Sequence, residues 1–574
     1  MSNNAQRELE LINEAKAKGT AATVATFVRL SGPGWLQGAI TLGGGSLAGA
    51  LYLGVIMGYH MMWLQPVAMI LGVIMLSAIS YVTLSTEERP FGAVNRHISP
   101  LLGWGWLIAT IMANIVWCLP QFALGTAAIQ QNLAPSLATP DGKVIAAVSL
   151  LVAGSIVVWF YESGSWGIKL FEIILKVMVG IVVLSFFGVV AAMTAKGLLP
   201  WGEIFAGLIP NPAYLFKPVP SLAEPIAAAG EYSQWWSDLI AGMQKDKIIT
   251  AFATAVGINM TFLLPYSMLR KGWSRGHREL AVFDLSIGLI VPFVLATGCV
   301  VIAAASQFHG HPNDVFALEV EYEAQRLQDP DAKPKAKELG EYFGFLDQRL
   351  AQAMGKEQFA NLTPAERSGA RAALPEADRN LAAMLAGRDN LALAKTLAPL
   401  VGEGVAQKLF GVGVVGMALS TIIILMLING FAFCELLGVE PSGKWHRVGT
   451  FIPAIGVLGP FVWSKAAPAL ATPTSVMGGA MLPIAYFSFL LLMNSPTLLG
   501  KNMPRGVARV WWNTLMIFAT VVASLASVWG LLGRTLSIGD NYKLPIGNIA
   551  LGALAVLLLL GTVSFFAKNG SRAE

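Results

Sequence analysis

Three consecutive glycines and a serine, Gly43-Gly44-Gly45-Ser46, lie in the middle of an apolar run over residues 33–57. Each glycine costs a helix about 1 kcal/mol relative to alanine. In lipid, non-helical backbone is tolerated only where it lines a cavity or is buried in protein. The cluster therefore predicts a helix break whose free N–H and C=O groups bind a solute, with Thr41 nearby. Close helix packing is the alternative, because Gly45 and Gly49 also form a GxxxG pair.

A second polar cluster surrounds Pro265 in the apolar run over residues 249–269. Proline removes a backbone donor and clashes with the preceding turn, so we expect the helix to kink or break there. The polar side chains of this cluster are Asn259, Thr261, Tyr266 and Ser267. They could bind the same solute, or they could bond only to their own helix around a simple kink.

The elements that carry these residues are apolar runs long enough to cross the roughly 30 Å hydrocarbon layer of a bilayer. The chain is 55% hydrophobic and only 13% charged, whereas soluble domains carry roughly 25% charged residues. Lipid must therefore be the solvent for most of its length, which predicts an all-α polytopic membrane protein with about twelve spans. We expect them near residues 33–57, 61–83, 102–130, 143–160, 169–195, 249–269, 281–306, 407–437, 448–466, 475–493, 508–531 and 545–567.

Lysine and arginine near the span ends set the orientation. The strongest signal is the basic loop 270–278, and the bias places both termini in the cytoplasm. The predicted organisation has five parts: a cytoplasmic segment 1–32, seven helices in 33–306 with an external loop 196–248, an external helical insertion 307–406, five helices in 407–567, and a cytoplasmic tail 568–574.

Other polar features do not indicate enzyme chemistry or nucleic-acid binding. The net charge of +5 is explained by the loops between the spans. A formal dinucleotide pattern at residues 411–416 opens a span without a preceding strand, so helix packing explains it and no cofactor is predicted. Asp284 lies in the first turns of the seventh span, where we expect it to pair with Arg275 or Arg278.

Each predicted break falls in the first span of a five-span block, as an inverted-repeat transporter requires. The chain also resembles the Nramp family of metal-ion transporters, as a divergent, Nramp-related branch. The segments that carry the resemblance include GPGWLQGAITLGGGSLAGALYLGVIMGY in the first span, NMTFLLPYSMLRKGW in the sixth and ALSTIIILMLINGFAFCELLG in the eighth. The resemblance implies a LeuT-like fold, an inverted five-helix repeat plus two additional helices, with the first and sixth helices unwound around a central site.

The chain departs from this family at its metal ligands. The family motif DPGN aligns with Gly43-Gly44-Gly45-Ser46, which has no carboxylate, and MPHN aligns with Leu264-Pro265-Tyr266-Ser267. The acidic pair of the third helix has no counterpart before Asp141. A bare divalent cation needs anionic or strongly donating ligands, and the hydroxyls of Ser46 and Thr261 are the candidates here.

Three functions fit these residues. The first is a secondary transporter of an inorganic cation, a divalent metal above all, in the cytoplasmic membrane. The second is a transporter of a small organic solute or carboxylate on the same fold, held by N–H groups at the helix breaks. The third is a membrane receptor or scaffold without transport. The expected partners are the lipid bilayer and a small ion or small-molecule substrate, with no nucleic acid and no protein partner predicted.

Overall fold

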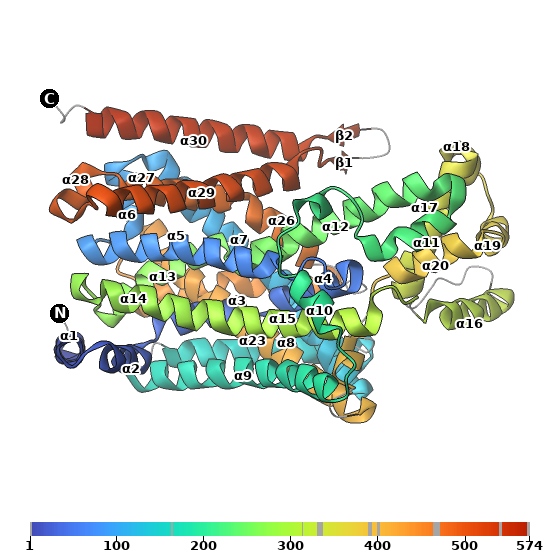
Figure 1. Cartoon of the computed structure of the whole chain (residues 1–574), viewed down its shortest axis with the longest axis horizontal. Helices are drawn as coiled ribbons and strands as arrows, with labels where there is room; N and C mark the ends of the chain where they lie inside the picture. The colour runs from blue at the N-terminus through green and yellow to red at the C-terminus, as the bar shows by residue number, and fades with distance from the viewer. Residues whose placement is uncertain are drawn as a thin grey trace.

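The computed structural model is built almost entirely of helices, and the long ones lie along the longest axis of the molecule (Figure 1). Both ends of the chain lie at one end of the bundle, and the helices of the predicted insertion lie at the opposite end (Figure 1). The structure describes residues 3–161, 165–312, 314–329, 337–388, 393–398, 402–462, 471–538 and 542–570.

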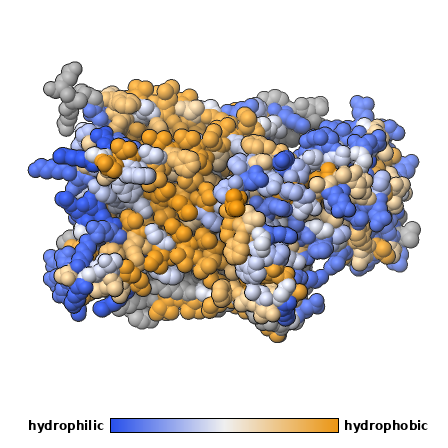
Figure 2. All heavy atoms as spheres, in the orientation of Figure 1, coloured by the Kyte–Doolittle hydropathy of each residue, from blue (hydrophilic) through white to orange (hydrophobic). Residues whose placement is uncertain are grey.

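Helices occupy eleven of the predicted spans. In chain order they are α3 (Pro33–Thr41) with α4 (Gly44–Met57), α5 (Leu64–Thr86), α7 (Pro100–Ala128), α8 (Pro140–Tyr161), α9 (Ser165–Ala195), α12 (Ser233–Ala255) with α13 (Ile258–Lys271), α14 (Arg278–Leu285) with α15 (Val291–Phe308), α23 (Glu403–Leu437), α26 (Ala471–Ala480) with α27 (Leu482–Met493), α29 (Gly506–Leu531) and α30 (Ile546–Gly570). Within the described residues, nine helices are long and apolar enough to cross a membrane, or ten with the bent pair α3–α4. Apolar side chains form a band across the middle of the molecule, with hydrophilic ends on both sides (Figure 2).

Short elements connect the spans. They are α6 (Pro90–His97), the π-helical turns η1 (Ile129–Leu133) and η7 (Ser286–Ile290), η2 (Pro135–Leu137), η6 (Arg275–His277), α24 (Gly443–Thr450), α28 (Pro496–Leu499), η11 (Gly500–Asn502), and the antiparallel strands β1 (Leu536–Ile538) and β2 (Tyr542–Leu544).

The predicted ninth span at 448–466 is wrong as a regular α-helix. The chain there forms the 3-10 helix η9 (Ile452–Leu458) and the short helix α25 (Gly459–Val462), and residues 463–470 lie outside the described part. Pro453 and Pro460 interrupt a regular hydrogen-bond ladder. Glycine lets this segment lie directly on the α7 backbone, because a Cβ on Gly459 would be 2.1 Å from the Leu119 carbonyl oxygen.

The N-terminal segment packs on the loop between α13 and α14. Glu8 accepts a hydrogen bond from the Trp273 indole at 2.9 Å, and Lys16 pairs with Glu279 at 2.7 Å. The two helices of this segment are α1 (Asn3–Lys18) and α2 (Thr20–Leu30). The basic loop is therefore covered by chain that precedes the first span.

The connection after α9 and the insertion meet at the other end of the bundle. The connection holds α10 (Trp201–Ala206), η3 (Pro212–Leu215), η4 (Pro220–Leu222), α11 (Ala223–Ala228) and η5 (Gly230–Tyr232), and α12 begins earlier than the predicted sixth span. The insertion holds α16 (Val315–Gln328), α17 (Lys337–Met354), α18 (Lys356–Ala360), α19 (Pro364–Ala372), α20 (Glu376–Leu385) and η8 (Lys395–Leu397).

The buried carboxylate of Asp378 joins the insertion to the sixth span. Asp378 on α20 lies 3.1 Å from Arg349 on α17 and accepts a hydrogen bond from the Trp236 indole of α12. The Tyr52 hydroxyl of α4 donates to the Arg388 carbonyl at 3.3 Å. Burial lowers the pKa of the Arg388 guanidinium to about 10. The insertion thus contacts both the first span, at α4, and the sixth span, at α12.

Asp378→Ala should destabilise this attachment, because it leaves the buried Arg349 without its counter-charge. Removing one partner of a buried pair costs about 3–5 kcal/mol. Hydrogen exchange measured across residues 337–388 should rise accordingly. Asp314→Ala is the control, because its pair with Lys395 is exposed and should cost about 1 kcal/mol or less. Equal effects of the two variants would contradict the anchoring role of Asp378.

Candidate functional site

The first span is broken where the glycine run predicted. α3 ends at Thr41, α4 begins at Gly44, and their axes differ by 51°. Gly43 adopts extended backbone, with φ −88° and ψ −177°, so its φ value does not demand glycine. Space does, because a Cβ would lie 1.9 Å from Thr421 Oγ1 and 2.9 Å from the Ile40 carbonyl oxygen. Close packing and helix breaking, which are alternatives in the sequence, occur together here.

The sixth span is broken at Val256 and Gly257, where the backbone is extended between α12 and α13. The predicted break at Pro265 is wrong, because α13 continues through this proline. Pro265 removes a single helical donor, whereas two consecutive extended residues release the final carbonyl groups of α12. Those carbonyl groups find partners in the first span.

Side chains at the first break supply hydrogen bonds that the second break leaves missing. The Thr41 hydroxyl donates to the Ala255 carbonyl at 3.4 Å, and the Ser46 hydroxyl donates to the Thr254 carbonyl at 3.2 Å. The last carbonyl groups of a helix have no partner within it, so side chains or ligands must satisfy them. Thr41 Oγ1 also lies 3.3 Å from Met260 Sδ on α13. Carbonyl, hydroxyl and thioether donors therefore gather between the breaks.

Buried amide side chains surround this cluster. Gln37 lies one turn before Thr41 on α3, Gln121 lies on α7, and Asn259 lies in the first turn of α13; each is at most 2% exposed. Gln121 Oε1 lies 2.6 Å from the position of a Cβ on Gly44. Within the described residues, both amide atoms of Gln37, Oε1 of Gln121 and Nδ2 of Asn259 have no hydrogen-bond partner. An unpaired buried polar group costs free energy, so these atoms favour a ligand or water.

The structure separates the predicted site residues into two sets. Those that lie at the breaks are Thr41, Gly43, Gly44, Gly45, Ser46 and Asn259. The remaining three lie further along α13 and are engaged in packing. The Thr261 hydroxyl accepts from the Trp106 indole at 3.0 Å, Tyr266 stacks on Phe262 at 4.7 Å, and Ser267 donates to the Leu264 carbonyl at 2.7 Å.

Sequence reasoning did not identify the donors contributed by the sixth span. Thr254, Ala255 and Met260 look like ordinary residues of an apolar helix, because two of them act through main-chain carbonyl groups. The available signal was Gly257, which lies close to the middle of the apolar part of this span. Pro265 is the stronger sequence signal for a break, although glycine is the residue that commonly allows backbone to leave a helix.

A buried carboxylate caps the N-terminus of α3. Asp284 is 1% exposed and accepts hydrogen bonds from Gly32 N at 3.1 Å and Gly34 N at 2.6 Å. The expected pairing of Asp284 with Arg275 or Arg278 is wrong: the Arg278 guanidinium donates to the Ser85 hydroxyl instead. Free N–H groups and the helix dipole make a helix N-terminus a strong site for a carboxylate. Asp284 therefore holds the first half-helix against the seventh span.

The donor set between the breaks is neutral. The described residues contain no group of three or more His, Cys, Asp or Glu side chains placed to hold a metal ion. The negative ends of the helix dipoles of α3 and α12 both point to the breaks, so they favour a cation there. The positive ends of α4 and α13 begin at the same place, which leaves room for an anionic group as well.

Comparison with known proteins assigns the family. The model of the natural resistance-associated macrophage protein-like family, Nramp, matches residues 34–329 and 382–533. The chain belongs to the Nramp family. Nramp proteins are membrane transporters, and the match includes both helix breaks and most of the spans. No curated protein matches the sequence.

Solved structures share the fold of this Nramp protein at low sequence identity. The manganese transporter of Eremococcus coleocola, in complex with an aromatic bis-isothiourea compound, has a TM-score of 0.61 and 14% identity, covering 95% of this chain and 96% of that one. A histidine-to-alanine variant of the same transporter has a TM-score of 0.61 and 13% identity, covering 95% and 94%. The LeuT-like, all-α fold expected from the sequence is confirmed, with nine or ten candidate spans in the described residues instead of about twelve.

Asp284→Asn should loosen the N-terminus of α3, because an amide offers one acceptor oxygen where the carboxylate offers two. Weakening a buried, charge-assisted cap costs about 1–3 kcal/mol. Thermal unfolding in detergent should shift to lower temperature, and hydrogen exchange should rise at residues 32–36. Glu279→Gln is the control, because Glu279 is 70% exposed in its side chain. An unchanged melting temperature for Asp284→Asn would contradict the capping role.

Proposed function

We propose that this Nramp protein is a secondary transporter that moves an inorganic cation, most favourably a divalent metal ion, and binds it between the two helix breaks. The observation that carries the proposal is the meeting of the carbonyl end of α12 with the hydroxyls of Thr41 and Ser46. Oxygen donors of this kind replace the water shell of a hard cation. The manganese transporter with the same fold supports a metal substrate.

The binding groups that we assign are Thr41, Ser46, the carbonyl groups of Thr254 and Ala255, and the Met260 thioether. Met260 lies in the first turn of α13, just after the break, so the methionine of the family motif MPHN is better matched by Met260 than by Leu264. A thioether favours softer transition metals over magnesium or calcium. Because no carboxylate neutralises the charge, we expect the ion to retain part of its water shell, with Gln121 and Asn259 as hydrogen-bond partners.

A small organic solute is the second candidate. The N–H groups at the start of α4 and the unpaired amide nitrogens of Gln37 and Asn259 would suit a carboxylate. Neutral donors and helix N-termini can bind such a solute, which does not need the anionic ligands that this site lacks. Uptake assays with manganese, magnesium and a panel of amino acids separate the two, and absence of flux with every solute would favour a receptor.

We place the protein in the cytoplasmic membrane with both termini in the cytoplasm. The concentration of lysine and arginine in the loops on the side of the termini supports this orientation. The insertion 307–406 would then lie outside, where Asp378 accepts a hydrogen bond from Trp236 of the sixth span.

Met260→Leu should weaken manganese transport, because it removes the sulfur donor at nearly constant volume. We expect the apparent affinity for manganese to fall about tenfold, equivalent to roughly 1.4 kcal/mol, while the protein folds normally. Uptake into proteoliposomes is the measurement. Met268→Leu, a buried methionine on the same helix, is the matched control and should behave as wild type. Equal kinetics in both variants would remove Met260 from the site.

Gly43→Ala should reduce flux at least about tenfold, because its methyl group would overlap Thr421 and push the first span away from α23 at the break. Gly45→Ala is the matched control, since the nearest atom to its Cβ, Thr254 Cγ2, lies at an ordinary 3.4 Å. Uptake rates normalised to the amount of folded protein should therefore be lower for Gly43→Ala than for Gly45→Ala. Wild-type flux from Gly43→Ala would argue against a substrate site at this break.

A further inference from the structure

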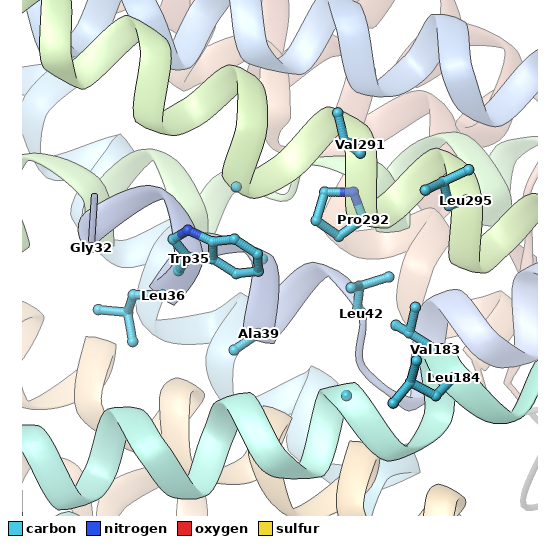
Figure 3. A pocket seen from close by; sticks show the side chains of 13 residues that line it. Gly32, Trp35, Leu36, Ala39, Leu42, Val183, Leu184, Val291, Pro292 and Leu295 are labelled. Atoms are coloured by element: carbon cyan, nitrogen blue, oxygen red, sulfur yellow. The ribbon is translucent and has the colours of Figure 1, made fainter. Parts of the chain in front are cut away.

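An apolar groove runs along the outside of α3, the half-helix that leads to the first break. Its volume is about 330 Å³, and its walls come from α3, α9 and the start of α15 (Figure 3). Trp35, Ala39 and Leu42 line one side, Val183 lies on α9, and Leu295 lies on α15. The groove ends at Leu42, the residue at which α3 stops, and does not include the hydroxyl and carbonyl groups of the proposed transport site.

The groove opens sideways, towards lipid. Side chains on its rim are exposed although they are large and apolar: Leu184 is 71% exposed, Val291 51% and Trp35 38%. In a chain that spans a membrane, such exposure of apolar side chains on the spanning helices means contact with hydrocarbon. Water would gain no hydrogen bonds along these walls, so the groove requires an apolar occupant.

The ammonium group of Lys271 lies at the end of the groove nearest the termini. Lys271 Nζ is 2.9 Å from the position of a Cβ on Gly32, which lines the groove, and it donates to the Leu30 carbonyl at 3.0 Å. Arg29, in the last turn of α2, is exposed next to this carbonyl group. Basic side chains just outside the hydrocarbon attract anionic headgroups, at about 1 kcal/mol each.

We propose that this groove is a phospholipid site, in which one acyl chain lies along α3 and an anionic headgroup contacts Lys271 and Arg29. The groove matches a phospholipid in shape and in charge. It starts beside the Lys271 ammonium group and is lined by apolar groups up to Leu42. The bound chain would complete the packing of α3. At one wall of the groove α3 packs directly on η7, since a Cβ on Gly38 would lie 2.6 Å from the Gly288 carbonyl oxygen, and both glycines line the groove.

Lipid bound here would stabilise α3 in its position beside the break. The chain replaces missing protein contacts on the open side of a helix that Asp284 holds at its N-terminus. Binding to this conformation alone stabilises it by mass action. The groove is separate from the proposed substrate site, so lipid binding there does not depend on which solute is transported.

Gly180→Phe provides a direct test, because nothing lies within 4 Å of a Cβ at this groove-lining position. The phenyl ring should fill the groove without strain. Gly552→Phe on α30 is the matched control: Gly552 is exposed, and nothing lies within 4 Å of its Cβ either. Brominated phosphatidylglycerol, titrated into detergent-solubilised protein, quenches nearby tryptophan fluorescence. The difference between each protein and its Trp35→Phe derivative isolates Trp35 from the 16 tryptophans.

We expect saturable quenching of Trp35 in the wild type and in Gly552→Phe, near one lipid per chain, and its loss in Gly180→Phe. Brominated phosphatidylcholine should need at least about fivefold more lipid for half-quenching, because Lys271 and Arg29 favour a net anionic headgroup. Unchanged saturable quenching in Gly180→Phe would overturn the site. Equal affinity for the two lipids would overturn the assigned headgroup contacts.

Discussion

The structure depends on one constraint, that main-chain groups released inside a membrane must find partners within the protein. Two helices leave regular winding at facing positions, and the first supplies hydroxyl donors for carbonyl groups that the second releases. Thr41 and Ser46 bond to the last carbonyl groups of α12, so the break in the sixth span depends on the first span. The same groups that stabilise the pair are those that a cation would exchange for its water ligands.

The first half-helix is positioned by contacts of a different kind at each end. Asp284 caps its N-terminus, glycine allows backbone contact with η7 along its length, and Gly43 fits against Thr421 where it ends. Trp35, Ala39 and Leu42 line the apolar groove on its open side. Contacts with η7, α13, α14 and α23 therefore fix the half-helix that leads to the first break.

Much of the fold follows from the sequence, because the length of an apolar run and the position of glycine act locally. The break at Gly43 is such a case. The break at Gly257 was missed because Pro265, the stronger local signal, is tolerated within a buried helix, whereas Val256 and Gly257 depend on partners in a distant segment. The donors Thr254 and Ala255 act through main chain, which leaves no trace in side-chain type. The prediction of a regular ninth helix is wrong because the prolines and glycines of this segment allow close contact with α7. Only the tertiary structure reveals that contact.

The account is tested most directly by locating manganese in crystals of the protein through its anomalous scattering. It predicts a peak between the breaks, about 2.1–2.6 Å from oxygen donors that include the Ala255 carbonyl or the Thr41 hydroxyl. A peak bound elsewhere in the spans, in protein that still transports manganese, would contradict it.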